Sequence, residues 1–138
     1  MARGFRFGGS GGSEKQPVDI IINGILQNGF TLSGNVAQEA ANIKVTRDSS
    51  TNGGKIELNK NISGYSALSI TGGNAQTNAG LQVDVGSTGK YTQFPIGGTS
   101  ATTRSISLDA SSDSFNFIGL SVYNNQGICR IQQMTLIP

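Results

Sequence analysis

The sequence predicts an all-β fold, an antiparallel β-sandwich preceded by an extended N-terminal arm. Apolar residues fall in short bursts that alternate with polar residues, which is the period of strands with one buried face. Turn signals rich in Gly and Asn separate these bursts at intervals of about 8–12 residues, as in sandwiches and barrels. Glycine is abundant, at 20 of 138 residues, which suits a fold with many tight turns.

Size and composition indicate one folded domain. A chain of 138 residues is long enough to bury a single core. Only 13% of the residues are charged, whereas 36% are hydrophobic. Disorder accompanies high net charge and few apolar residues, so this composition favours a folded chain.

The chain divides into an arm, residues 1–16, and a β-sandwich domain, residues 17–138. Residues 8–13 have the sequence GGSGGS, which is typical of a flexible linker. Two interpretations of the arm remain open: a disordered tail, or a tether that docks on a partner protein. A basic and aromatic cluster ahead of the linker would make the docking contacts: Arg3, Phe5, Arg6 and Phe7.

The net charge of +2 is concentrated at the N-terminus. Residues 1–17 hold three basic residues and one acidic residue, and the rest of the chain holds seven of each. A neutral domain argues against nucleic-acid binding through a broad basic face. No apolar run approaches the ~20 residues of a membrane-spanning helix, and the N-terminus lacks the apolar stretch of a signal peptide. We therefore expect no membrane insertion, and folding in the cytoplasm.

Turn signals delimit the expected strands in order. Pro17 marks the start of the domain, and the turn pairs Asn23-Gly24 and Asn28-Gly29 bracket a short apolar segment. We expect about eight or nine strands among the following segments: 18–22, 25–27, 30–32, 43–46, 55–58, 67–71, 81–85, 91–94, 104–109, 115–123 and 128–136. Residues 36–41 are the one candidate for a helix, of one or two turns, with Asn35 as its N-cap.

The segments 115–123 and 128–136 are the most hydrophobic in the chain and flank a four-residue turn that ends in Gly127. This pattern predicts a closing β-hairpin at the centre of the core. The apolar parity changes between Phe117 and Ile118, which predicts a bulge or a strand covered on both faces. The residues expected to be buried are Ile20, Ile22, Leu32, Ile56, Leu58, Leu68, Ile70, Leu81, Val83, Ile106, Leu108, Leu120, Val122, Ile131 and Leu136.

The residue types argue against an enzyme. The chain has no histidine, the usual general base, so the common Ser and Cys triads and most zinc sites are excluded. Asp109 and Asp113 are the only close acidic pair, and they flank a turn in which Asp is expected to bond backbone amides. The single Cys129 lies in an apolar strand and is expected to be a buried thiol. We expect no cofactor.

Residues 48–53 show a faint similarity to a calcium-binding loop, with oxygen-bearing side chains at Asp48, Ser50 and Asn52. The position that should supply the closing bidentate carboxylate is Asn59. A hairpin turn explains the segment better, and a weak calcium site is the alternative.

Aromatic and amide side chains near turns are the candidates for ligand contact. Four aromatic residues either plug the ends of the core or stack on sugar rings, and the absence of tryptophan weakens the second interpretation. Two asparagines beside the last of them could bond sugar hydroxyls. The candidate residues are Tyr65, Tyr91, Phe94, Tyr123, Asn124 and Asn125.

Three segments resemble the galactose-binding-like β-jelly-roll domains of small tail-region proteins of phages and prophages. These are residues 56–70 (IELNKNISGYSALSI), the paired segments 105–110 and 115–122, and the Gly-rich start MARGFRFGG. The resemblance implies a jelly-roll sandwich in a virion component of a tail, baseplate, fibre or capsid surface. Such a protein is made in the cytoplasm of the bacterial host.

Two functions remain open. The first is a non-enzymatic phage structural protein whose arm binds other virion proteins in a multi-copy assembly or homo-oligomer, with host-surface glycan adhesion by the sandwich. The alternative is a free carbohydrate-binding module. Weak arm contacts would add through avidity in the first case.

Overall fold

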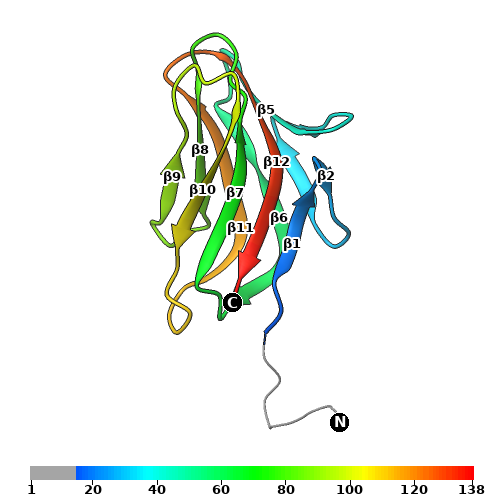
Figure 1. Cartoon of the computed structure of the whole chain (residues 1–138), viewed down its shortest axis with the longest axis vertical. Coiled ribbons are helices and arrows are strands. Elements are labelled where there is room, and N and C mark those ends of the chain that lie inside the picture. Colours follow the sequence, from blue (N-terminus) through cyan, green and yellow to red (C-terminus); the bar gives the residue numbers. More distant parts are fainter. Residues whose placement is uncertain (1–14) are drawn as a thin grey trace, which may run out of the picture.

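The computed structural model describes residues 15–138, which form two antiparallel β-sheets packed face to face (Figure 1). The arm residues Arg3, Phe5, Arg6 and Phe7 lie outside the described residues. Twelve strands follow in order: β1 (Val18–Ile22), β2 (Ile25–Leu26), β3 (Thr31–Gly34), β4 (Val36–Gln38), β5 (Ile43–Arg47), β6 (Gly53–Ser63), β7 (Ala67–Gly73), β8 (Gly80–Val85), β9 (Tyr91–Gln93), β10 (Ala101–Ser107), β11 (Ser114–Tyr123) and β12 (Gly127–Ile137). The predicted all-β antiparallel sandwich is confirmed.

The seven-stranded sheet has the order β10-β7-β12-β1-β2, and β5, which carries β4 on its other side, pairs with the first part of β12. The five-stranded sheet has the order β3-β6-β11-β8-β9. The strand count exceeds the eight or nine expected because several strands of only two to four residues, such as β2 and β4, are held by their neighbours. β2 lies within the expected segment 25–27, whereas the local pattern of β4 is too short to predict a strand.

The predicted closing hairpin is wrong. β11 lies at the centre of the five-stranded sheet between β6 and β8, whereas β12 lies at the centre of the seven-stranded sheet between β7 and β1. The connection between Tyr123 and Gly127 therefore crosses from one sheet to the other. Both strands are apolar because each faces the core from the middle of its own sheet, a pattern that a hairpin would also produce.

The helix expected at residues 36–41 is also wrong. Val36–Gln38 forms β4, in which Val36 is buried and lies opposite Val45 of β5. The side-chain amide of Gln38 donates to the carbonyl oxygen of Gly24 at 2.6 Å. The side-chain oxygen of Gln38 accepts from the backbone amide of Leu26 at 2.9 Å. These tertiary contacts override the local helical tendency of the segment.

The core between the sheets contains the predicted residues except Ile22 and Leu32, which are half-buried. In place of Ile22, Ile21 is fully buried. The register of β1 against β12 shifts between Asp19 and Ile21, so two successive residues, Ile20 and Ile21, both face the core. Because Ile20, Ile21 and Ile22 are all apolar, the sequence pattern cannot show which two of them face the core.

The predicted irregularity of β11 is found between Phe115 and Phe117, but the extra residues of the bulge lie in its partner β6. Phe115 lies opposite Ile62 of β6, but Phe117 lies opposite Glu57, so the β6 residues between them bulge away from Asn116. Beyond the shift, Ile118 and Leu120 take the buried positions. Residues 15–138 contain no helix of the length and apolarity that crossing a membrane requires.

Candidate functional site

The outer face of the five-stranded sheet concentrates polar and aromatic side chains on a rigid support. The strand registers place five residues in one row across all five strands, in the order Ser33, Lys55, Gly119, Asp84 and Tyr91. Adjacent strands lie about 4.8 Å apart, so the row spans about 19 Å. We call this outer face, with its neighbouring rows, the platform.

The cation of the platform lies against an aromatic ring. The Lys55 ammonium nitrogen is 4.6 Å from the centre of the Phe117 ring, on the next strand. Glu57 lies directly opposite Phe117 in the row beside the central one. The cation–π contact holds the ammonium at the surface rather than over Asp84.

Three polar side chains form a hydrogen-bonded chain at the other side of the platform. The Gln82 amide donates to the two carboxylate oxygens of Asp84 at 3.1 and 3.2 Å. The Gln93 amide donates to the Gln82 side-chain oxygen at 2.8 Å. The chain fixes the orientation of the Asp84 carboxylate and leaves it lone pairs that can accept from a ligand hydroxyl.

Gly119 leaves a gap in the middle of the platform. It lies between Lys55 and Asp84, and a Cβ placed there would be in ordinary contact with the Asp84 Cβ, at 3.5 Å. The backbone therefore does not require glycine for steric reasons. Its effect is to bring bare backbone to the surface between a cation and a carboxylate.

Tyr91 ends the central row on the edge strand β9 and is 56% exposed. It also borders an open hollow of about 680 Å³ between this edge and the edge strand β10 of the other sheet. The hollow is lined further by Lys90, Leu108 and Asp109. Tyr91 can therefore offer its ring to a ligand from the platform or from the hollow.

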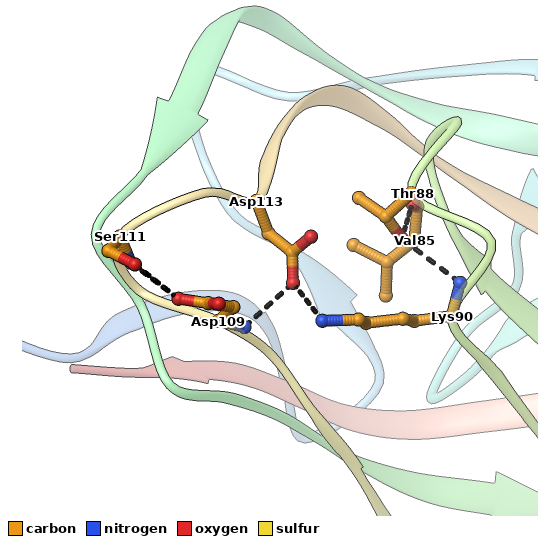
Figure 2. A network of polar contacts seen from close by, with 6 residues as sticks. All are labelled: Val85, Thr88, Lys90, Asp109, Ser111 and Asp113. Atoms are coloured by element: carbon orange, nitrogen blue, oxygen red, sulfur yellow. Dashed lines mark hydrogen bonds and ion pairs between the residues drawn. The ribbon is translucent and has the colours of Figure 1, made fainter.

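Two residues that line this hollow, Lys90 and Asp109, belong to a polar network (Figure 2). Asp113 accepts from the Lys90 ammonium and, at 2.7 Å, from the Asp109 backbone amide, which joins the β8–β9 turn to the β10–β11 loop. These two bonds lower the pKa of the Asp113 carboxyl, the backbone bond more strongly. Hydrogen bonds from Ser111 lower the pKa of Asp109 to about 2. Both aspartates accept hydrogen bonds from backbone amides of the turn, as the sequence indicated.

The aromatic residues proposed from the sequence do not form one site. Phe94 is only 1% exposed and belongs to the core, so it cannot face a ligand. The ring of Tyr123 lies against Gly80, and its hydroxyl donates to the Phe94 carbonyl oxygen at 2.8 Å. Tyr65 is half-buried against the core at another place on the surface. Of the four, Tyr91 alone lies on the platform.

The two asparagines of the crossing connection support loops. The Asn124 amide donates to the Asn78 carbonyl oxygen and the Asn125 amide to the Thr77 carbonyl oxygen, both at 2.9 Å. Both residues are exposed, but these bonds hold the connection against the β7–β8 loop. Their orientation is set by the fold.

The calcium loop considered at residues 48–53 is an Asx turn. One carboxylate oxygen of Asp48 accepts from the Ser50 amide, the Ser50 hydroxyl and the Thr51 amide, and the other accepts from Asn35. These bonds lower the Asp48 pKa to about 2. Within residues 15–138 no group of three or more acidic, Cys or His side chains is placed to hold a metal ion.

Most of the platform is not recognisable in the sequence. The alternation of segment 81–85 predicts that Gln82 and Asp84 face outward, and the alternation of segment 55–58 predicts the same for Lys55 and Glu57. Which strands are neighbours was not visible, so nothing indicated that these residues share a surface. The position of Gly119 between them follows only from the register.

Comparisons with known proteins find the same fold in carbohydrate-binding modules. A family 29 carbohydrate-binding module from Piromyces equi superposes with a TM-score of 0.67 at 14% identity, over 88% of this chain and 89% of that chain. A mutant of a family 29 module gives 0.68 at 12% identity, over 88% and 90%. Another mutant, complexed with cellulohexaose, gives 0.63 at 11% identity, over 88% and 89%. The likeness confirms the jelly-roll sandwich.

Further family 29 structures carry alanine in place of a tyrosine, an aspartate, a lysine or an arginine, and concern the mechanism of ligand recognition. No protein-family model and no curated protein matches the sequence. None of these neighbours is described as a phage protein, so the virion role stays a prediction from the sequence.

Proposed function

We propose that this protein is a non-catalytic carbohydrate-binding module that binds an oligosaccharide on its platform. The observation that carries the proposal is the central row, in which a lysine, a glycine gap, an oriented aspartate and an exposed tyrosine follow one another across the sheet. The family 29 modules, which share the fold over nearly the whole of both chains, support the same class of function.

The residue types fit the chemistry of a sugar chain. A pyranose ring has an apolar face of C–H groups, which stacks on an aromatic ring such as Tyr91, and an edge of hydroxyls, which donate and accept hydrogen bonds. Asp84 accepts, Lys55 donates, and the Gln82 and Gln93 amides do both. The tyrosine, aspartate and lysine replaced in the family 29 structures have counterparts in residue type on the platform.

The open shape favours an extended chain over a single small molecule. Small ligands bind in enclosed pockets that bury most of their surface. The platform is a sheet face about 19 Å across, which gives several sugar residues contacts in succession. Affinity would come from a few stacking and hydrogen-bonding residues along that length.

The test is binding of soluble polysaccharides by affinity electrophoresis and calorimetry, with Tyr91→Ala, Asp84→Ala and a matched control, Ser105→Ala, on the outer face of the other sheet. Loss of an aromatic contact of about 0.5–1.5 kcal/mol predicts about 2- to 13-fold weaker binding for Tyr91→Ala. Ser105→Ala should bind normally. Equal binding by all three variants would refute the platform as the site, and release of reducing ends would refute a non-catalytic role.

The phage assignment adds a proposal about location, in which the arm attaches the module to a virion. Deleting residues 1–13 should then abolish incorporation into particles and leave polysaccharide binding unchanged. Normal incorporation of the shortened protein would refute the tether.

A further inference from the structure

The bulge in β6 shapes a second surface beside the platform. Residues 58–61 lie opposite Asn116 alone, because Ile62 pairs with Phe115 and Glu57 pairs with Phe117. Asn59 adopts a left-handed backbone conformation, with φ of 63°, and its amide donates to the Gly29 carbonyl oxygen at 2.9 Å. Bulges re-aim side chains and are frequent next to functional sites.

Residues of this bulge line two hollows. The first, of about 280 Å³, is lined by Glu57, Asn59, Lys60, Asn61 and Asn116. The second, of about 230 Å³, shares Lys60 and Asn61 with the first. Because Glu57 also belongs to the platform, the first hollow connects the platform to the second.

The second hollow combines cations with aromatic walls, and we call it the basic hollow. Its chemistry comes from six residues: Lys15, Phe30, Lys60, Asn61, Ser63 and Tyr65. The Lys15 ammonium lies 4.9 Å from the centre of the Tyr65 ring. Gly64 has a φ of 85°, and a side chain there would overlap the Lys15 stem, so this glycine leaves the space that Lys15 occupies.

Nothing acidic in the described chain lines the basic hollow. The three ion pairs found within residues 15–138 involve neither Lys15 nor Lys60. Two lysines therefore line a small space whose other walls include the half-buried rings of Phe30 and Tyr65. Such a space favours a ligand with both a negative charge and an apolar face.

We infer that the basic hollow is a second binding site, selective for a sugar residue that bears a carboxylate. The ammonium groups of Lys15 and Lys60 bind the carboxylate, the Phe30 ring contacts the C–H face of the sugar beside the Lys15–Tyr65 pair, and Asn61 and Ser63 bond its hydroxyls. The volume is below the ~300 Å³ of pockets for drug-sized ligands, which fits one sugar residue. The choice of a sugar over another carboxylate rests on the proposed function; the anionic selectivity does not.

The experiment titrates the full chain with an oligogalacturonate and with the neutral galactose oligomer, following backbone amide shifts by NMR and affinity by calorimetry. Lys60 is exposed, so Lys60→Gln should fold normally. We expect it to weaken oligogalacturonate binding about three- to fivefold, the effect of losing one solvent-facing ion pair, and to leave the neutral oligomer unaffected. Lys44→Gln, on β5 of the other sheet, is the matched control.

The shifted amides separate the outcomes. Shifts at Ser63 and Tyr65 that appear with the oligogalacturonate and not with the neutral oligomer support the inference. Shifts confined to Asp84 and Gly119 with both oligomers, and no effect of Lys60→Gln, overturn it and leave the proposed function intact. Equal shifts at Ser63 and Tyr65 with acetate or inorganic phosphate overturn the assignment to a sugar. Shifts at the basic hollow without any on the platform support the inference and refute the platform as the binding site of the proposed function.

Discussion

Lys55 and Asp84 lie on opposite sides of Gly119 in a single row of the five-stranded sheet. Their charges do not meet: the Lys55 ammonium lies over Phe117, and the Asp84 carboxylate accepts from Gln82. Both charged groups thus remain at the surface with a strip of bare backbone between them. A ligand can contact both without displacing an ion pair.

Filling the gap at Gly119 should impair binding without unfolding the protein. Gly119→Ala places a Cβ in ordinary contact with Asp84 and removes the entropic cost of a strand glycine. Gly119→Leu extends further and covers the surface between Lys55 and Asp84. We expect polysaccharide affinity to fall from wild type to Ala to Leu, with thermal midpoints at or near that of wild type. Unchanged affinity in Gly119→Leu would exclude contact between ligand and the row centre.

The hydroxyl of Tyr123 should contribute to stability and not to binding. Tyr123→Phe removes the hydrogen bond to the Phe94 carbonyl, and we expect a loss of about 0.5–1.5 kcal/mol in the free energy of unfolding. Urea denaturation followed by circular dichroism measures this loss, with an unchanged slope against urea. Weakened sugar binding in a variant of normal stability would instead restore Tyr123 as a ligand contact.

Acid should weaken the joint between the β8–β9 turn and the β10–β11 loop. The pKa values of Asp109 and Asp113 lie below the ordinary value of 3.8, that of Asp109 at about 2. A carboxyl with a lowered folded-state pKa stabilises the fold above the unfolded-state value and loses that contribution as pH falls through the folded value. Stability should therefore decrease between about pH 4 and pH 2.

The variant Asp113→Asn tests which groups cause this decrease. It should be less stable than wild type at pH 7 and show a shallower fall between pH 4 and pH 2, measured as urea midpoints. Asp19→Asn, on the other sheet, controls for the loss of one negative charge. Parallel pH profiles for wild type and Asp113→Asn would place the acid sensitivity elsewhere.

Cys129 should be unreactive in the folded protein. It is fully buried, and burial raises the pKa of its thiol to about 11, so the reactive thiolate is scarce at neutral pH. A thiol reagent at pH 8 should label Cys129 only in the presence of denaturant. Mass spectrometry measures the labelled fraction. Rapid labelling under native conditions would show that β12 opens locally, because the folded strand gives the reagent no access.

Alternation identified the sandwich and most of its core because the burial of one strand face is a local property of the sequence. The partners of each strand are not local. The segment between Tyr123 and Gly127 has the residues of a hairpin turn. It crosses between the sheets because β11 pairs with β8 and β12 pairs with β7, so the two apolar strands do not pair with each other. The platform depends on the same pairing: Lys55, Asp84 and Gly119 come from distant parts of the chain. Tyr91 was named from the sequence because it is an aromatic residue near a turn, but the same rule also named Tyr65, Phe94 and Tyr123, which lie elsewhere.

The central position of β12 constrains when the protein can fold. It is the last strand in the chain, yet it pairs with β7, β1 and β5 and so joins segments made much earlier. Until it emerges from the ribosome, β1 and β7 have no common neighbour, and the apolar inner surface of the seven-stranded sheet stays uncovered. Domains with such long-range contacts fold slowly. The seven-stranded sheet therefore cannot be completed before β12 has been synthesised, and its apolar inner surface is exposed to aggregation until then.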